Sequence, residues 1–424
     1  MLKVGVGFSK NGQADLAARE AAASAMQRAG IHKADLTLVF ATSHFHHDYP
    51  HILHILHELT KPAQLCGCSA YGVLTGEEEI ENSPGIAVLV LKSKKIRPKT
   101  FLVKNIFDRN SDAGRELAEI LHEDLTGTGP LFLFPDTFNF DFNQFYASFI
   151  SAMAENDSSS GRLFETGQSR VPDTKKKGRP QILGGGASEE GTLNETFQFL
   201  GKSVESNSLT GLRMGGTLLS QSGVAHACHP IGESLMVTRA KGNTIYEISG
   251  KPAFYFFSDL FKNRLHKPEE IQNAASLVFL GLSVNPCDTS FNKIDYVVRN
   301  ILSVDSEEGT LNISDRVEEG KIVSFMVRDP RRAMEETEKM ISALAEGFSS
   351  QGAVPRFGIY INCCGRGNSL YGKRNVDTGL IRKYFGELPL IGFFSYAEMA
   401  STPCGDTLWH NYSGVLTIFG EEGK

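Results

Sequence analysis

The 424-residue sequence has no long hydrophobic run, no excess of basic residues and few cysteines. No uninterrupted apolar stretch reaches the roughly 18 residues that span a bilayer, and the amino terminus lacks the features of a signal peptide. Lys and Arg total 43 against 49 Asp and Glu, and this net charge of −6 argues against a nucleic-acid-binding face. We therefore expect a cytoplasmic protein with neither a membrane nor a nucleic acid as partner.

The sequence also lacks the common motifs for metals and nucleotides. Its seven cysteines form no pair of CxxC motifs, so a structural zinc site is not expected, and a secreted disulfide scaffold would be shorter and richer in cysteine. Neither a Walker loop nor a dinucleotide-binding glycine fingerprint occurs. We predict reduced thiols and no cofactor.

Histidine is concentrated in one short segment. Six of the twelve histidines lie between residues 43 and 57, namely His44, His46, His47, His51, His54 and His57. The last three are spaced i, i+3, i+6 on an expected helix, whereas helical metal sites favour i, i+4 with an acidic residue nearby. A polar helix face and a metal site both remain open.

Three stretches share the order helix, strand, helix, strand, strand. The expected elements are 15–29, 36–43, 49–59, 64–69 and 85–91; then 112–124, 131–137, 141–154, 181–188 and 197–200; then 331–348, 357–363, 377–384, 388–395 and 414–419. Continuous apolar runs between helices are typical of strands covered on both faces. We therefore predict an α/β fold of repeated units that form mainly parallel layers.

A different region lies between the second and third units. Residues 201–329 contain several strand-like runs, including 253–257, and one expected helix from Pro268 to Gly281, which indicates a mostly antiparallel, β-rich insertion. Residues 155–180 are polar and rich in Ser and Gly, and we predict a mobile surface loop there. The expected domains are 1–200 and 201–424, the latter divided into β-rich 201–329 and α/β 330–424.

Glycine is abundant, with 42 residues, and clusters after the apolar runs. The densest cluster is Cys363-Cys-Gly-Arg-Gly367, which follows an expected parallel strand, where ligands bind in open α/β sheets. Gly365 and Gly367 would let backbone N–H groups turn towards a ligand, and Arg366 suits a carboxylate or phosphate. The alternative is a tight turn with a surface arginine.

Two further loops resemble each other, because Gly67 aligns with Gly392 and Tyr71 with Tyr396. Each follows a buried strand and carries small, hydroxyl and aromatic residues that suit a small polar ligand. Glu398 could accept from an ammonium group or pair with a surface lysine. Cys363 or Cys364 could instead act as a nucleophile, although only one of two adjacent strand residues can face a cleft.

Taken together, six motifs resemble the FIST proteins, which carry FIST N and FIST C domains. The motifs are Gly-Cys-Ser-Ala-Tyr-Gly at 67–72, Gly-Gly-Gly-Ala-Ser at 184–188, His-Pro-Ile-Gly at 229–232 with 237–243, Ile-Ser-Gly-Lys-Pro-Ala at 248–253, Val-Arg-Asn-Ile-Leu at 298–302, and the closing segment 363–398. The resemblance implies a bacterial, cytoplasmic sensory protein of signal transduction that binds small ligands such as amino acids. Since no output segment follows Lys424, we expect a separate signalling partner.

We therefore predict a small-ligand-binding sensory protein rather than an enzyme. Arg366 and Arg299 would hold the carboxylate of an amino acid or a similar metabolite. The rest of the pocket would be shaped by Cys363, Gly365, Gly367, Ser69, Ser395 and Glu398. The alternatives are an enzyme with a Cys363 or Cys364 thiolate nucleophile and an interaction protein without a pocket.

Overall fold

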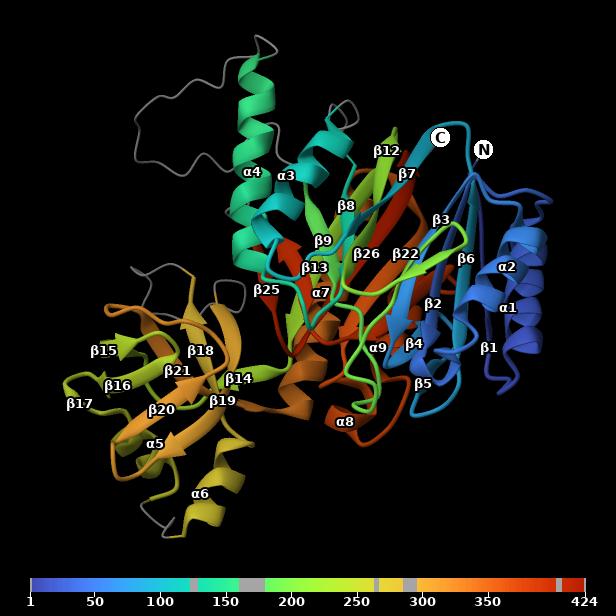
Figure 1. Ribbon diagram of the computed structural model, residues 1–424. Helices are drawn as coiled ribbons and strands as arrows, with labels where there is room; N and C mark the ends of the chain where they lie inside the picture. Colours follow the sequence, from blue (N-terminus) through green and yellow to red (C-terminus); the bar gives the residue numbers. More distant parts are fainter. Residues whose placement is uncertain are drawn as a thin grey trace. The chain divides into compact units, whose positions relative to one another are not determined.

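The computed structural model describes residues 2–122, 129–159, 180–262, 267–284, 296–401 and 406–422, and the chain forms two units (Figure 1). Unit 1 comprises Met1–Val224, Glu338–Trp409 and Gly414–Lys424, and unit 2 comprises Ala225–Thr337 and His410–Ser413. Among the described helices, none combines the length and hydropathy that a membrane crossing needs.

Three six-stranded sheets dominate unit 1. The first runs β1 (Lys3–Ser9), β6 (Ile86–Lys92), β2 (Leu36–Thr42), β3 (Gln64–Ala70), β10 (Gln198–Leu200), β11 (Ser203–Glu205). The second runs β25 (Thr407–His410), β24 (Glu398–Ser401), β9 (Ile182–Gly185), β8 (Leu131–Pro135), β12 (Ser208–Gly216), β7 (Ile96–Lys104). The third runs β13 (Leu219–His226), β26 (Ser413–Glu422), β22 (Ala353–Cys363), β23 (Leu390–Ser395), β4 (Gly72–Thr75), β5 (Glu79–Glu81).

Helices precede and join the central strands of each sheet, and except for the short α8 they follow the order that the sequence predicts. The helices are α1 (Ala14–Ala29), α2 (Tyr49–Thr60), α3 (Asn110–Leu121), α4 (Phe142–Ser159), α7 (Pro330–Ser350), α8 (Gly367–Tyr371) and α9 (Val376–Phe385). A short 3₁₀ turn, Ser43–Phe45, lies before α2. The amphipathic pattern of α2 is clear, since Ile52, Leu53, Ile55 and Leu56 are buried while its histidines face outward.

The prediction of mainly parallel layers is wrong, because the sheets are mixed. Each contains one parallel pair joined through a helix, β2–β3, β8–β9 or β22–β23, whereas neighbours such as β1, β6, β12, β10 and β4 pair antiparallel. The error has a physical cause. A continuous apolar run reports that both faces of a strand are covered, and β6 is covered on both faces although it runs antiparallel.

The three repeats exchange strands in a cycle. Strands β10 and β11 of the second repeat extend the parallel pair β2–β3 of the first repeat. Strands β24 and β25 of the third repeat extend the parallel pair β8–β9 of the second repeat. The pair of the third repeat is extended in turn by β4 and β5 of the first. Every sheet of unit 1 therefore contains strands from two repeats.

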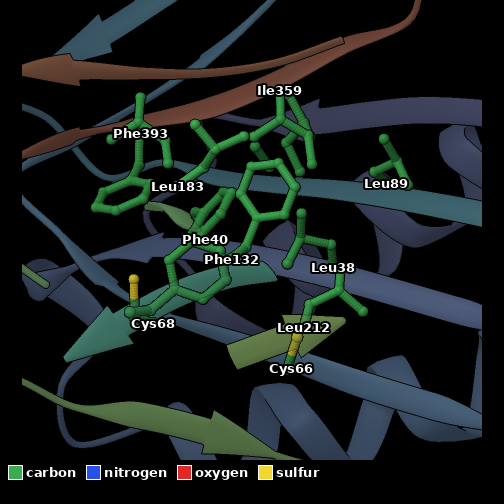
Figure 2. Packing of buried hydrophobic residues seen from close by; sticks show 14 of the residues in the cluster. Leu38, Phe40, Cys66, Cys68, Leu89, Phe132, Leu183, Leu212, Ile359 and Phe393 are labelled. Carbon is green, nitrogen blue, oxygen red and sulfur yellow. The ribbon is translucent and has the colours of Figure 1, made fainter. Parts of the chain in front are cut away.

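A single apolar core fills the space that the three sheets share. Phe40 of the first sheet, Phe132 of the second and Phe393 of the third belong to it, and Figure 2 shows them among neighbours from all three sheets. The opposite face of the first sheet packs against alanines of α1 and leucines and isoleucines of α2. The central strands are consequently covered on both sides, which explains their unbroken hydrophobic sequences.

Unit 2 is an antiparallel barrel. Strands β15 (Leu235–Lys241), β16 (Thr244–Ile248), β20 (Thr310–Ile313), β19 (Tyr296–Asp305), β18 (Phe279–Ser283) and β21 (Ile322–Arg328) follow one another, and a β21–β15 pairing closes the ring. Two short strands, β14 (Cys228–Pro230) and β17 (Lys251–Pro252), pair with β21 and β16. The β-rich insertion is thus present, and closure removes the exposed sheet edges.

Two elements of unit 2 differ from the prediction. Residues 253–257, predicted as a strand, begin helix α5 (Ala253–Leu260), because Ala253 and Phe257 are buried four residues apart on one helix face. The helix predicted from Pro268 to Gly281 ends at Ala275 as α6 (Pro268–Ala275), and its last residues belong to β18. The loop predicted for 155–180 overlaps α4, which continues to Ser159, and residues 160–179 lie outside the described residues.

Candidate functional site

The carboxyl ends of all six strands in the three parallel pairs deliver polar or aromatic side chains to one place in unit 1. We call this group the strand-end cluster and define it as His44 after β2, Tyr71 after β3, Phe138 after β8, Glu189 and Glu190 after β9, Cys364 after β22 and Tyr396 after β23. Carboxyl ends of parallel strands are the usual position for ligand sites in α/β proteins. The cluster is therefore the first candidate for a functional site.

Buried serines tie the three repeats together beneath this cluster. Ser188 donates to the carbonyl of Phe394 and accepts from the backbone N–H of Tyr71 at 2.8 Å. Ser69 donates to the carbonyl of Ser188 at 3.2 Å. Each serine thus bonds to a loop of another repeat, which fixes the relative positions of the strand ends.

Direct contacts connect the members of the cluster. The hydroxyl of Tyr396 donates to Glu189, 2.8 Å from its carbonyl and 3.1 Å from Oε1. The ring of Phe138 meets that of Tyr396 edge-on at 5.9 Å between centroids. His44 Nδ1 lies 3.1 Å from Glu190 Oε1, with both side chains partly exposed. A ligand at this position would meet aromatic walls and carboxylate oxygens.

The electrostatic environment keeps the phenols protonated and one carboxylate ionised. Burial raises the pKa of Tyr396, and the neighbouring Glu189 adds to the rise. Burial, followed by nearby Glu81 and Cys364, raises the pKa of Tyr71. Burial also acts to raise the pKa of Glu189, but backbone N–H groups after residue 190 and the Tyr396 hydroxyl outweigh it, so that this pKa is lowered.

The pKa of Glu190 moves in the opposite direction. Burial raises it, and the proximity of His44 only partly counteracts the rise. The two adjacent carboxylates therefore differ in environment, one held by hydrogen bonds and the other next to an imidazole. Such a pair can accept hydrogen bonds from a ligand cation.

Arg366, the predicted carboxylate ligand, is buried within the protein. Its side chain has no exposed surface, and its Nη2 lies 3.1 Å from Asp377 Oδ2 in a buried ion pair. The same guanidinium donates to the hydroxyl of Tyr371 at 2.9 Å, and Asp377 accepts from the hydroxyl of Tyr360 at 2.9 Å. This network neutralises Arg366 and places it where it holds α8 and α9 to β22.

The glycine-rich turn does bind a carboxylate, but the carboxylate belongs to the chain itself. The N–H of Asn368 donates to Glu81 Oε1 at 3.0 Å. Gly367 has a φ of +53°, and a Cβ there would stand 2.7 Å from the same oxygen. Glycine is therefore required both for the left-handed backbone and for the close approach of Glu81.

Glu79, two residues earlier on β5, plays the same part at the start of α9. It accepts from the N–H groups of Asn375 and Thr378, at 2.7 Å and 3.0 Å, and from the Thr378 hydroxyl at 3.0 Å. Burial and the nearby Asp377 nevertheless raise its pKa to about 7. The segment between β22 and β23 is thus held by carboxylates from another repeat.

The other predicted ligand residues are mostly buried as well. Those with almost no exposed surface are Ser69, Cys363, Gly367, Ser395 and Glu398. Ser395 donates to Glu398 Oε1 at 2.6 Å, so these two side chains bind each other. Gly365 and Cys364 are partly exposed.

Arg299 belongs to unit 2, whereas the rest of the predicted set belongs to unit 1. Its Nε lies 2.7 Å from Asp315 Oδ2, and its side chain is 8% exposed. The structure therefore pairs both predicted arginines with aspartates of their own units.

The histidine-rich segment forms separate pairs. His51 lies 3.3 Å from Asp15 and His54 lies 3.1 Å from Glu58, while His44 joins the strand-end cluster. Within the described ranges, no group of three or more potential ligands is arranged to hold a metal ion. His46 and His47 pack ring against ring at 3.7 Å between centroids.

A cleft of about 570 Å³ opens at the other end of β23, next to its first residue. Its walls come from β1, from the turn between β4 and β5, from the end of α9 and from the segment that leads into β23. Both arginines that line it, Arg28 and Arg382, are exposed rather than buried. Sequence reasoning did not single out this place.

Unit 1 is thus built from three repeats that exchange strands around a shared core, with the strand-end cluster at the carboxyl ends of their parallel pairs. This arrangement defines an α+β protein. The FIST N domain matches residues 35–251 and the FIST C domain matches residues 253–401, so the chain belongs to the FIST family. FIST domains are linked to sensory signal transduction and small-ligand binding.

The chain is also similar to uncharacterized proteins along its whole length. A Mycobacterium tuberculosis protein is 27% identical over 419 residues, which cover 99% of this chain and 100% of the relative. A Mycobacterium bovis protein is 24% identical over 421 residues, again 99% and 100% of the two chains. A crystal structure of a chorismatase aligns over 99% of both chains with 9% identity and a TM-score of 0.34, a likeness too low to inform function.

Proposed function

We propose that this protein is a sensory ligand-binding protein of intracellular signal transduction, and that it binds an amino acid or a similar metabolite at the strand-end cluster. One observation carries the proposal: six strand ends from three repeats bring Glu189, Glu190, Tyr71 and Tyr396 together. Carboxylates and phenol oxygens accept hydrogen bonds from an ammonium group, and the flanking rings suit an apolar side chain. Buried serines, including Ser69 and Ser395, would keep the loops in register.

The ligand would also bridge the three repeats, because its neighbours come from all of them. Binding would tighten contacts between loops that lie far apart in the sequence, and a separate signalling protein would detect that change. Ligand energy can shift such an equilibrium only by its differential affinity for the two states. The proposal therefore requires a ligand that stabilises unit 1.

A thermal-shift screen against amino acids, nucleotides and short carboxylates tests this function, because a ligand at 100 times its Kd adds about 2.7 kcal/mol to the free energy of unfolding. For an amino acid that binds, Glu190→Gln should weaken affinity by about tenfold or more, the scale of a charge-assisted hydrogen bond. Glu421→Gln, which changes a partly exposed carboxylate paired with Arg356, is the matched control.

Full affinity in both Glu190→Gln and Tyr396→Phe would place the ligand elsewhere. Failure of every compound to shift the unfolding temperature would remove the sensory function itself.

A second candidate function rests on Cys364, which is partly exposed at the cluster while Cys363 is buried. In that case the protein is an enzyme with a thiolate nucleophile. Iodoacetamide should then label Cys364 faster than free cysteine near neutral pH, and a Cys364→Ser variant should abolish the labelling. Slow labelling of the native protein would dismiss this function and leave the sensory proposal intact.

A further inference from the structure

The cleft beside β23 has an outer wall made by a sheet edge. Strand β1 is the first strand of its sheet, so one of its two sides has no strand partner among the described residues. The Val6 carbonyl accepts from Arg28 Nη1 at 3.2 Å, which shows that it points away from β6. In an antiparallel ladder residues two apart point the same way, so the N–H and C=O groups of Val4 also face outward, towards the cleft.

The same cleft holds one cation and one anion that no partner in the described chain neutralises. Arg382 donates from Nε and Nη2 to the carbonyl of Gly76, which leaves three of its five N–H groups available, and it forms no ion pair with any residue that the structure describes. Glu387, exposed just after α9, has no hydrogen-bonded or ion-paired partner among the described residues. Arg28, by contrast, is paired with Glu77.

Apolar side chains complete the lining. Val4 and Val6 stand on β1, and Leu388, Pro389 and Leu390 form the facing wall. The volume of about 570 Å³ lies within the roughly 300–1,000 Å³ of typical ligand pockets. Residues 4–6 in extended conformation span about 7 Å, which is the length of a dipeptide backbone.

We propose that this cleft binds a short peptide with free termini. The peptide backbone adds to the outer edge of β1 through the groups of Val4, its terminal carboxylate binds Arg382 and its terminal ammonium binds Glu387. Its apolar side chains lie against Val4 and Leu388. Strand addition supplies affinity through main-chain hydrogen bonds, and the two charged ends select a small zwitterion over a longer chain.

The site is separate from the strand-end cluster, since the two lie at opposite ends of β23. It therefore goes beyond the sensory proposal, and either can hold without the other. A sensory protein with two such sites would respond to a peptide and to a second small ligand.

Isothermal titration calorimetry with the dipeptide Leu-Leu, its N-acetyl form, its C-terminal amide and free leucine tests the proposal on the full chain. We expect Leu-Leu to bind, and we expect Arg382→Ala to lower the affinity for Leu-Leu by about tenfold. The C-terminal amide should bind more weakly than Leu-Leu to the native protein, and Arg382→Ala should not lower its affinity further. Glu387→Gln should weaken Leu-Leu but not the acetylated form. Arg356→Ala, which removes an exposed arginine elsewhere on unit 1, should change nothing.

Three outcomes would overturn it. Leu-Leu fails to bind the native protein; or the amide and the acetylated form bind as tightly as Leu-Leu; or free leucine binds as tightly as the dipeptide, which would make the cleft a single-residue site. Urea unfolding of each variant separates a lost contact from a lost fold.

Discussion

The strand-end cluster and the Arg366 network both follow strand ends of unit 1, but they differ in how far their charged side chains are buried. Arg366 and Asp377 neutralise each other in the interior, whereas Glu190 and His44 remain partly exposed. A buried charge requires a partner within the protein because water is not available to stabilise it. Polar residues at a strand end therefore indicate a ligand site only when their charged groups stay accessible from outside the protein.

The strongest way to break this comparison is to remove Asp377. Asp377→Ala leaves the guanidinium of Arg366 buried without a counter-ion, and we expect a loss of about 3–5 kcal/mol in the free energy of unfolding, measured with urea. The control is Glu421→Ala, which disrupts the partly exposed ion pair with Arg356 and should cost no more than about 1 kcal/mol. Equal losses in the two variants would mean that Arg366 reaches water.

The glycine-rich turn sharpens the same contrast with a matched pair of variants. Gly367→Ala combines a left-handed φ with a Cβ 2.7 Å from Glu81 Oε1, while Gly372 has a similar φ of +66° in open space. We expect Gly372→Ala to cost about 1–2 kcal/mol from backbone strain alone and Gly367→Ala to cost about 2–4 kcal/mol. Thermal unfolding would show whether the two variants differ. Equal losses of stability would mean that the close approach of Glu81 to residue 367 does not add to the cost of the substitution.

The smallest effect concerns pH. The folded pKa of Glu79 is raised to about 7 from an ordinary value near 4.5, so the folded state binds its proton more tightly than the unfolded state does. The contribution of Glu79 to the free energy of unfolding is therefore complete below about pH 4.5 and is lost as pH rises through 7. On the order of 2 kcal/mol of that loss falls between about pH 5.5 and 8. Urea unfolding between pH 5.5 and 8 measures the slope, which Glu79→Gln should flatten. An unchanged slope in that variant would assign the pH dependence to another group.

The hydrophobic pattern was sufficient to predict where most helices and strands lie, but not how the strands pair. The β6 sequence is as apolar as a parallel strand, because helices cover one side of its sheet and the shared core covers the other. Residues 253–257 show the same limit, since a short aromatic run fits a strand and a helix equally well. Whether a strand pairs parallel or antiparallel, and whether a short apolar run forms a strand or a helix, depends on tertiary contacts that a short stretch of sequence does not contain.

The sequence indicates part of the strand-end cluster, whereas the predicted ligand residues stay a prediction. The correspondence of Tyr71 with Tyr396 located two of the strand ends, and Ser188 stands at the equivalent position of the second repeat. Extending that alignment through all three repeats would have pointed to Glu189 as well. The burial of Arg366 could not be predicted from the sequence. Its partner Asp377 lies 11 residues later on another element, and only the fold brings the two side chains together.

The cyclic exchange of strands has a consequence for how unit 1 can be divided. A single repeat cut out of the chain would lose the two strands from another repeat that complete its sheet. The two strands that it contributes to a neighbouring sheet would be exposed to water. Such a fragment would present open sheet edges and one third of a core, a combination that favours aggregation. The three repeats must therefore assemble as one cooperative body, and dissection at the repeat boundaries should yield no independently stable piece.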